Sequence, residues 1–204
     1  MGKFFRNQQD AAQLSPREIL QNKYNSARAN LLLVIAFTVI NIIMLLTDSS
    51  SYFLFSLNIP YMFMLYGMLL TGRIPELFTE GEYAMTEFLP DIALVIAAVI
   101  AAVIILLFLL CWIFSKKNRV GWIIAALVLF SLDTLYLLLC GITADSVIDI
   151  IFHIWVIVSL ASGISAYKKL KALPPEEEVI ETTGEVVNEV FAEVIDEIPA
   201  EVDE

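Results

Sequence analysis

Five long apolar segments alternate with polar stretches along the 204-residue chain. The clearest of them contains 23 consecutive residues without a charge, from Ile92 to Phe114. As a helix, that run is long enough to cross a hydrocarbon core of about 30 Å. Because lipid offers the backbone no hydrogen-bond partner, all five segments are predicted to be helical. The expected fold class is an all-α, polytopic membrane bundle, with segments at about residues 31–47, 52–71, 92–115, 120–141 and 147–167.

Polar residues interrupt some of these segments. Asn41 lies within the first, and the second contains Asn58 and Pro60, of which the proline removes one backbone donor. The second segment is therefore the least regular of the five.

Residues 1–30 form a basic, polar segment ahead of the first apolar run. Within it, Ser15-Pro16-Arg17-Glu18 has the form of a capping box, with proline at the first helical position. We expect a helix to begin near Pro16 and to run toward the membrane. No small-residue cleavage site follows the apolar run, so the sequence predicts a retained anchor rather than a cleaved signal peptide.

Composition and charge exclude several classes of protein. Apolar residues make up 59% of the chain and charged residues 17%, too apolar for a soluble single-core enzyme. The net charge of −11 is uneven, because residues 173–204 contain 12 acidic residues and no Lys or Arg. The remainder is near neutral and has no basic stripe for nucleic acid. Cys111 and Cys140 lie in apolar runs, where cysteine behaves as a small hydrophobe.

Short segments rich in Lys and Arg next to membrane helices stay on the cytoplasmic side, and this sets the orientation of the helices. Such bases cluster in residues 1–30, 116–119 and 168–171, whereas residues 48–51 and 141–146 carry none. Two interpretations fit this pattern. In the first, segment 52–71 enters and returns on one side or lies partly in the outer interface, which gives four crossings and an external 71–91 connection. In the second, five full crossings place at least one basic flank outside. The interruptions in segment 52–71 favour the first.

Small residues recur at four-residue spacing in two of the segments. They are Ala93, Ala97 and Ala101, with Ala98 and Ala102, and then the pairs Ser159/Gly163 and Ser162/Ala166. Such stripes let helix backbones approach closely. They predict either packing within this bundle, which is the simpler interpretation, or an interface with a second copy in a homo-oligomer.

Three ionisable residues lie in the last two segments: Asp133, Asp149 and His153. Asp133 and His153 are each about ten residues from the turn that joins these segments, so an antiparallel hairpin places them at one depth. Asp149 is four residues before His153, on the same helix face. The cluster is interpreted either as a proton or cation relay or as a structural contact that fixes the hairpin register.

Motifs of enzymes and metal sites do not occur in the sequence. One histidine cannot form a multi-histidine metal site, and there is no H-E-x-x-H, G-x-S-x-G or glycine-rich phosphate loop. We therefore expect no enzymatic activity, no metal and no cofactor.

After residue 171, Pro174-Pro175 ends the membrane body and a four-residue repeat of Glu follows. As a helix, the tail would gather apolar side chains on one face, but like charges at i, i+4 and β-branched residues oppose helix formation in water. The apolar face is a candidate docking surface for a protein partner; it consists of Val187, Val190, Phe191, Val194, Ile195 and Ile198. The alternative is a solvating tail without a partner.

Part of the chain resembles an uncharacterised group of multi-pass membrane proteins from low-GC Gram-positive bacteria. The resemblance rests on Ala29-Asn30-Leu31-Leu32-Leu33-Val34, Tyr52-Phe53-Leu54-Phe55-Ser56 and Pro60-Tyr61, within about residues 26–72. It implies a bacterial cytoplasmic membrane and supplies no site residue.

Two functions follow as hypotheses. The first is an accessory or scaffold protein of the membrane that binds a partner through its acidic tail. The alternative is a channel or transporter component that handles protons or cations through Asp133, Asp149 and His153.

Overall fold

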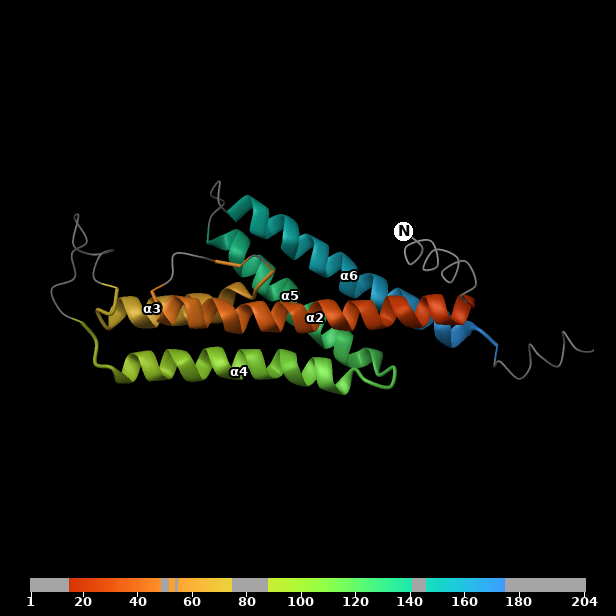
Figure 1. Ribbon diagram of the computed structural model, residues 1–204, viewed down its shortest axis with the longest axis horizontal. Helices are drawn as coiled ribbons and strands as arrows, with labels where there is room; N and C mark the ends of the chain where they lie inside the picture. Colours follow the sequence, from red (N-terminus) through yellow and green to blue (C-terminus); the bar gives the residue numbers. More distant parts are fainter. Residues whose placement is uncertain (1–14, 49–51, 54, 75–87, 141–145, 175–204) are drawn as a thin grey trace, which may run out of the picture.

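The computed structural model describes residues 15–48, 52–53, 55–74, 88–140 and 146–174. These residues contain helices and no strand. The helices are α2 (Pro16–Leu46), α3 (Asn58–Leu70), α4 (Ile92–Phe114), α5 (Val120–Leu139) and α6 (Ser146–Ala172) (Figure 1). All except α3 are long and apolar enough to cross a membrane. The chain is therefore an all-α membrane bundle, as its apolar segments predict.

α2 begins where the sequence predicts it. The Ser15 hydroxyl accepts the Glu18 N–H at 3.2 Å, and the Glu18 carboxylate accepts the Ser15 N–H at 2.8 Å. This reciprocal capping box satisfies two donors that the first turn would otherwise leave unpaired. No break follows, so the polar start and the first apolar segment form one helix of 31 residues, about 46 Å long. The sequence changes from polar to apolar at residue 30, and this boundary lies inside the helix without interrupting it.

The second apolar segment is helical only in part, in line with the interruptions that its sequence contains. Helix α3 begins only at Asn58 and has 13 residues, which gives about 20 Å against a core of about 30 Å. It starts beside the last third of α2, where Thr38 bonds Leu57, and runs toward the end at which α2 finishes (Figure 1). We call residues 52–70 the re-entrant segment. Side chains of α2 supply hydrogen-bond partners to the non-helical backbone before α3, and Asp133 of α5 supplies them to its first turn.

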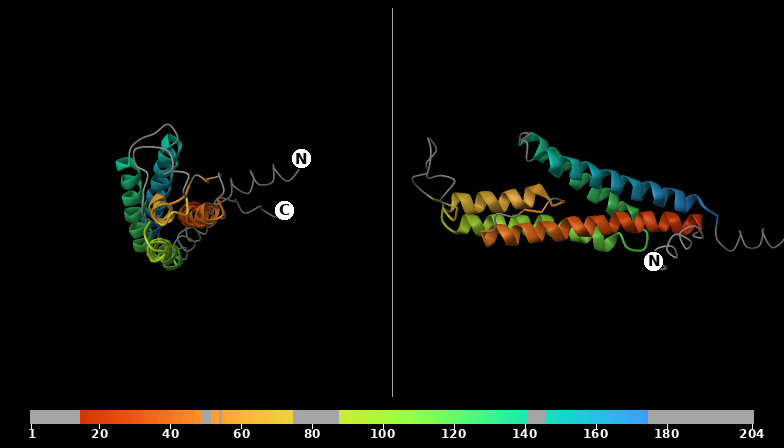
Figure 2. Two further views of the ribbon diagram at one scale, coloured as in Figure 1. Left: turned by 90° about the vertical axis from the view of Figure 1, so that its left-hand side faces the viewer. Right: turned by 45° about the horizontal axis from the view of Figure 1, so that its top comes forward.

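The remaining helices pack as antiparallel neighbours. α6 runs along α2, with Asn30 bonded to Ser159 at 2.6 Å and the Tyr24 and Tyr167 rings 5.9 Å apart. α4 follows α3 in the opposite direction, and α5 and α6 form the last hairpin (Figures 1 and 2). Helix α3 contacts α2, α4 and α5, and Asn58 and Pro60 of its first turn are buried.

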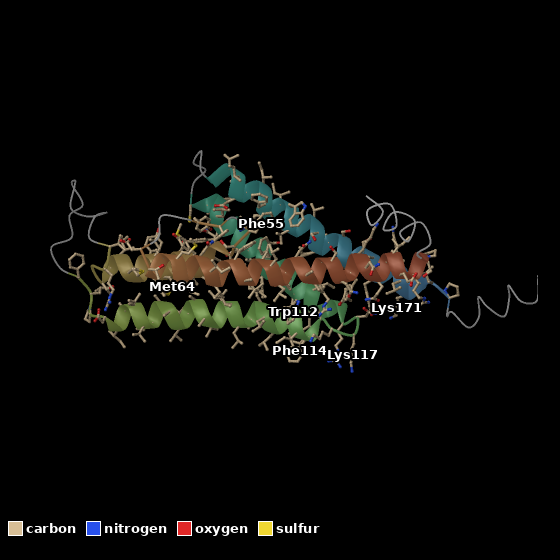
Figure 3. All side chains as sticks on the ribbon, in the orientation of Figure 1. Phe55, Met64, Trp112, Phe114, Lys117 and Lys171 are labelled. Atoms are coloured by element: carbon tan, nitrogen blue, oxygen red, sulfur yellow. The ribbon has the colours of Figure 1, made fainter. Side chains whose placement is uncertain are left out.

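The basic flanks gather at one end of the bundle, here called the basic end. Tyr24 and Arg28 of α2 donate to the carbonyl and hydroxyl oxygens of Ser115, at 2.7 and 2.8 Å, where α4 finishes. Lys117 and Lys171 lie toward this end in Figure 3. The last turn of α3 and the first turn of α4 lie at the opposite end (Figure 1), where the Leu89 N–H donates to the Leu70 carbonyl at 2.8 Å. This arrangement agrees with the four-crossing interpretation.

Small residues serve packing inside the bundle. Gly163 of α6 lies directly against Ala27 of α2. A Cβ on Gly67 of α3 would meet the Cβ of Ala97 at 2.7 Å. These contacts support the internal-packing interpretation of both predicted stripes, while Ala102 and Ser162 of the same stripes are exposed.

Candidate functional site

The first turn of α3 lies inside the bundle, yet all its backbone donors are accounted for. A helix leaves its first four N–H groups without partners. The Thr38 hydroxyl accepts the Leu57 N–H at 2.8 Å. The Asp133 carboxylate accepts the next two, from Asn58 at 2.9 Å and Ile59 at 2.8 Å. The fourth position is Pro60, which has no N–H. Side chains of α2 and α5 therefore cap α3, because its own N-cap residue, Leu57, cannot.

The backbone just before α3 is held by Asn41 of α2. Its side-chain amide donates to the Phe53 carbonyl at 2.7 Å and accepts the Phe53 N–H at 2.8 Å. It also donates to the Ser56 hydroxyl at 2.9 Å, which bonds the Tyr52 hydroxyl at 2.8 Å. Asn41 is 1% exposed, so these bonds form away from solvent, where an unpaired polar group is costly. The single asparagine of the first segment thus has a structural task.

Asp133 and His153, which the sequence places at one depth, lie side by side. The His153 Nε2 is 3.2 Å from the Asp133 Oδ2, and both side chains are 3% exposed. The His153 Nδ1 lies 2.8 Å from the Asp149 carbonyl oxygen. Since a carbonyl only accepts, Nδ1 carries a proton. The contact at Nε2 needs one more proton, held either as imidazolium facing carboxylate or as neutral imidazole facing carboxylic acid. The two amide donors on Asp133 suit the ion pair.

Asp149 takes part in the cluster through its backbone. It lies one turn nearer the start of α6 than His153 does, and its carbonyl orients the imidazole. The hydroxyls of Ser131 and Thr134 donate to carbonyls four residues earlier in α5, at 2.8 Å each. They therefore add no link to the Asp133–His153 pair. Phe130 covers the pair from α5, its ring stacked on the imidazole at 5.0 Å.

We call Thr38, Asn41, Ser56, Asp133 and His153 the polar cluster. Sequence reasoning found Asp133 and His153 from charge and spacing but missed Thr38 and Ser56. The sequence marks Asn41 only as a polar interruption of the first apolar segment. One signal was available: Leu57 is a poor N-cap residue, so a helix that begins after it needs acceptors from elsewhere. The side-chain nitrogen of Asn58 is the one buried side-chain polar atom without a partner among the described residues.

The cluster connects four parts of the fold through short hydrogen bonds. Asp133 alone joins α3, α5 and α6, because its two oxygens accept two backbone N–H groups of α3 and contact the His153 Nε2 of α6. A charged carboxylate at a helix N-terminus is also stabilised by the helix dipole. The arrangement can fix where the re-entrant segment sits and how the last hairpin packs. Because the Asp133 oxygens also accept the Asn58 and Ile59 N–H groups, a change at this carboxylate acts directly on the start of α3.

Three other features add nothing to this site. Among the described residues there is no group of three or more His, Cys, Asp or Glu side chains that could hold a metal ion. Cys111 is buried and Cys140 exposed, and neither forms a disulfide. The predicted docking face of the tail, from Val187 to Ile198, lies outside the described residues.

The fold and the cluster define a class: a multi-pass α-helical membrane protein with one short helix, α3, whose first turn is capped by side chains of other helices. No family model, curated protein or solved structure matches the chain.

Proposed function

We propose that this protein is an accessory or scaffold protein of a bacterial cytoplasmic membrane, which presents its acidic tail to a protein partner. The observation that carries the proposal is the contact at the start of the tail. The Arg17 guanidinium donates to the Pro174 carbonyl at 2.7 Å, beside the first turn of α2. The 30 residues that follow, with 12 acids and no base, therefore begin at a fixed point on the basic end.

The basic end faces the cytoplasm in this proposal. Its described bases include Arg28, which donates to Ser115, and Lys116, whose ammonium lies 5.4 Å from the Trp112 ring. Bases that flank membrane helices closely are retained on the cytoplasmic side, and tryptophan prefers the membrane interface. Both termini are then cytoplasmic, and the tail meets cytoplasmic partners.

The polar cluster supports an anchoring role for the membrane body. Asp133 caps α3 and pairs with His153, so its removal would disturb three helices at once. A rigid body that holds the basic end in place suits a scaffold. The partner chemistry follows from the tail: a groove with an apolar floor for Phe191 and its neighbours, and a basic rim for the Glu residues.

The decisive experiment places a photo-crosslinking residue at Phe191 in the full-length chain in cells. A control at Glu189 is two residues away, about 200° around a helix, and so lies off the docking face. We expect one protein to be captured from Phe191, little from Glu189, and less in high salt because screening weakens charge contacts. Capture of only lipid or of other copies of this chain contradicts the proposal.

The second candidate function, proton or cation handling, is favoured by the buried contact of 3.2 Å between the His153 Nε2 and the Asp133 Oδ2. It predicts that purified protein in liposomes conducts protons or cations and that Asp133→Asn abolishes the flux. The scaffold proposal predicts no flux above that of empty liposomes. Flux that is lost in Asp133→Asn would decide for the second candidate.

A further inference from the structure

A groove of about 300 Å³ opens between α2 and α6, apart from the polar cluster. Its walls include Lys23, Ser26 and Asn30 of α2, and Trp155, Ser159 and Ser162 of α6. Asn30 and Ser159 bond to each other at 2.6 Å across it.

The groove changes from polar to apolar along its length. Because α2 and α6 are antiparallel, Lys23 and Ser162 lie toward the basic end, and Trp155 and Val158 lie toward the middle of the bundle. Seven residues separate Trp155 from Ser162 along α6, which is about 10 Å. Trp155 and Val158 are 48% and 60% exposed on a surface that faces lipid. A polar mouth above an apolar channel matches a phospholipid, with its headgroup above an acyl chain.

The polar mouth contains donors that the fold does not use. Thr38, Ser131 and Thr134 donate to carbonyls of their own helices. By contrast, Ser26 and Ser162 are exposed, and neither makes a hydrogen bond within the described part of the chain. Over the same residues Lys23 has no ion-pair partner, and no carboxylate lines the groove. The site is therefore positively charged and rich in donors, which selects for an anion.

We propose that this groove binds one anionic phospholipid. The lipid phosphate accepts hydrogen bonds from the Lys23 ammonium and from the hydroxyls of Ser26 and Ser162. One acyl chain lies along Val158 and Trp155. Basic pockets between helices at the cytoplasmic membrane surface commonly take acidic headgroups, and this position fits the orientation proposed above, although the binding itself requires only the groove.

The test uses the full-length protein in mild detergent and counts bound lipid by native mass spectrometry. The probes are dioleoyl phosphatidylglycerol and dioleoyl phosphatidylcholine, which share acyl chains and differ in net charge. We expect one phosphatidylglycerol per chain and an affinity about five-fold above that of phosphatidylcholine, the ratio that about 1 kcal/mol per basic residue gives. Lys23→Gln should reduce the preference to near unity, and Ser26→Ala with Ser162→Ala should lower it without a change of charge.

The matched control is Lys168→Gln, which removes the same charge from α6. Lys168 is nine residues after Ser159, half a turn around the helix from the groove, and it is exposed. Binding should stay within two-fold of the unmodified protein, and inorganic phosphate at millimolar concentration should not compete. The proposal is overturned by equal affinity for the two lipids, or by equal losses in Lys23→Gln and Lys168→Gln. It is also overturned if phosphatidylglycerol binds only after residues 176–204 are deleted, because the tail would then be the occupant.

Discussion

The side-chain amide of Asn41 pairs with both backbone groups of Phe53, donating to its carbonyl at 2.7 Å and accepting its N–H at 2.8 Å. A neighbouring β-strand offers the same two bonds to a residue in a sheet. Here one polar side chain takes the place of a strand. Non-helical backbone is tolerated inside a membrane bundle only where such partners exist, so Asn41 permits the turn into the re-entrant segment.

Replacement of Asn41 should therefore destabilise the bundle in a graded way. Asn41→Leu leaves the Phe53 N–H and carbonyl and the Ser56 hydroxyl without this partner, and we expect a loss of about 2 kcal/mol in the free energy of unfolding. Asn41→Asp still accepts the Phe53 N–H and should lose less. Unfolding in detergent measures both. Ile40→Leu, a change on an exposed side chain, is the control, and a loss as large as that of Asn41→Leu would contradict the assignment.

The Asp133–His153 pair should show unequal losses. His153→Leu removes one donor from Asp133, a cost of about 1–2 kcal/mol, whereas Asp133→Leu also strips the caps from Asn58 and Ile59, for about 3–5 kcal/mol. The double variant should resemble Asp133→Leu, since His153 no longer matters once its partner is gone. A double-mutant cycle in detergent measures this coupling. Strictly additive losses would mean that the two side chains do not interact.

Close packing of α2 against α6 makes a specific prediction for glycine. In Gly163→Ala the new methyl group would meet the Ala27 methyl group, and overpacking of this kind costs about 1–3 kcal/mol. The swap Ala27→Gly with Gly163→Ala should recover most of the loss. Gly121→Ala is the control, because a Cβ there meets nothing within 4 Å. A thermal shift that is the same for Gly163→Ala and Gly121→Ala would argue against this contact.

Cysteine accessibility tests the re-entrant path. In a background without Cys111 and Cys140, single cysteines at Ser50 and Glu82 should both react with an impermeant thiol reagent in intact cells. A cysteine at Lys117, on the basic end, should react only after lysis. Five full crossings would instead put Ser50 and Glu82 on opposite sides, so labelling at only one of them would refute the four-crossing path. Labelling at Lys117 alone would support the same path with inverted orientation.

The sequence by itself determined the features that depend on local pattern. Runs of apolar residues located the spanning helices, and the Ser15–Glu18 pattern located the start of α2. Equal spacing from one turn brought Asp133 level with His153, since antiparallel helices rise equally per residue. Clustered bases placed three flanks at one end. These features depend on local contributions to the free energy, such as transfer of an apolar segment into lipid or capping of a helix, and each contribution comes from a short stretch of the chain.

Only the tertiary structure decided what happens between Thr47 and Leu70. Hydropathy cannot tell a full helix from a half-helix, because the same apolar residues suit both. The outcome depends on acceptors that are distant in sequence: Thr38 lies 19 residues before Leu57, and Asp133 lies 75 residues after Asn58. A hydrogen bond forms only when donor and acceptor meet at about 3 Å in the right direction. The packing of whole helices determines whether these donors and acceptors come within that distance, and no local pattern in the sequence predicts it.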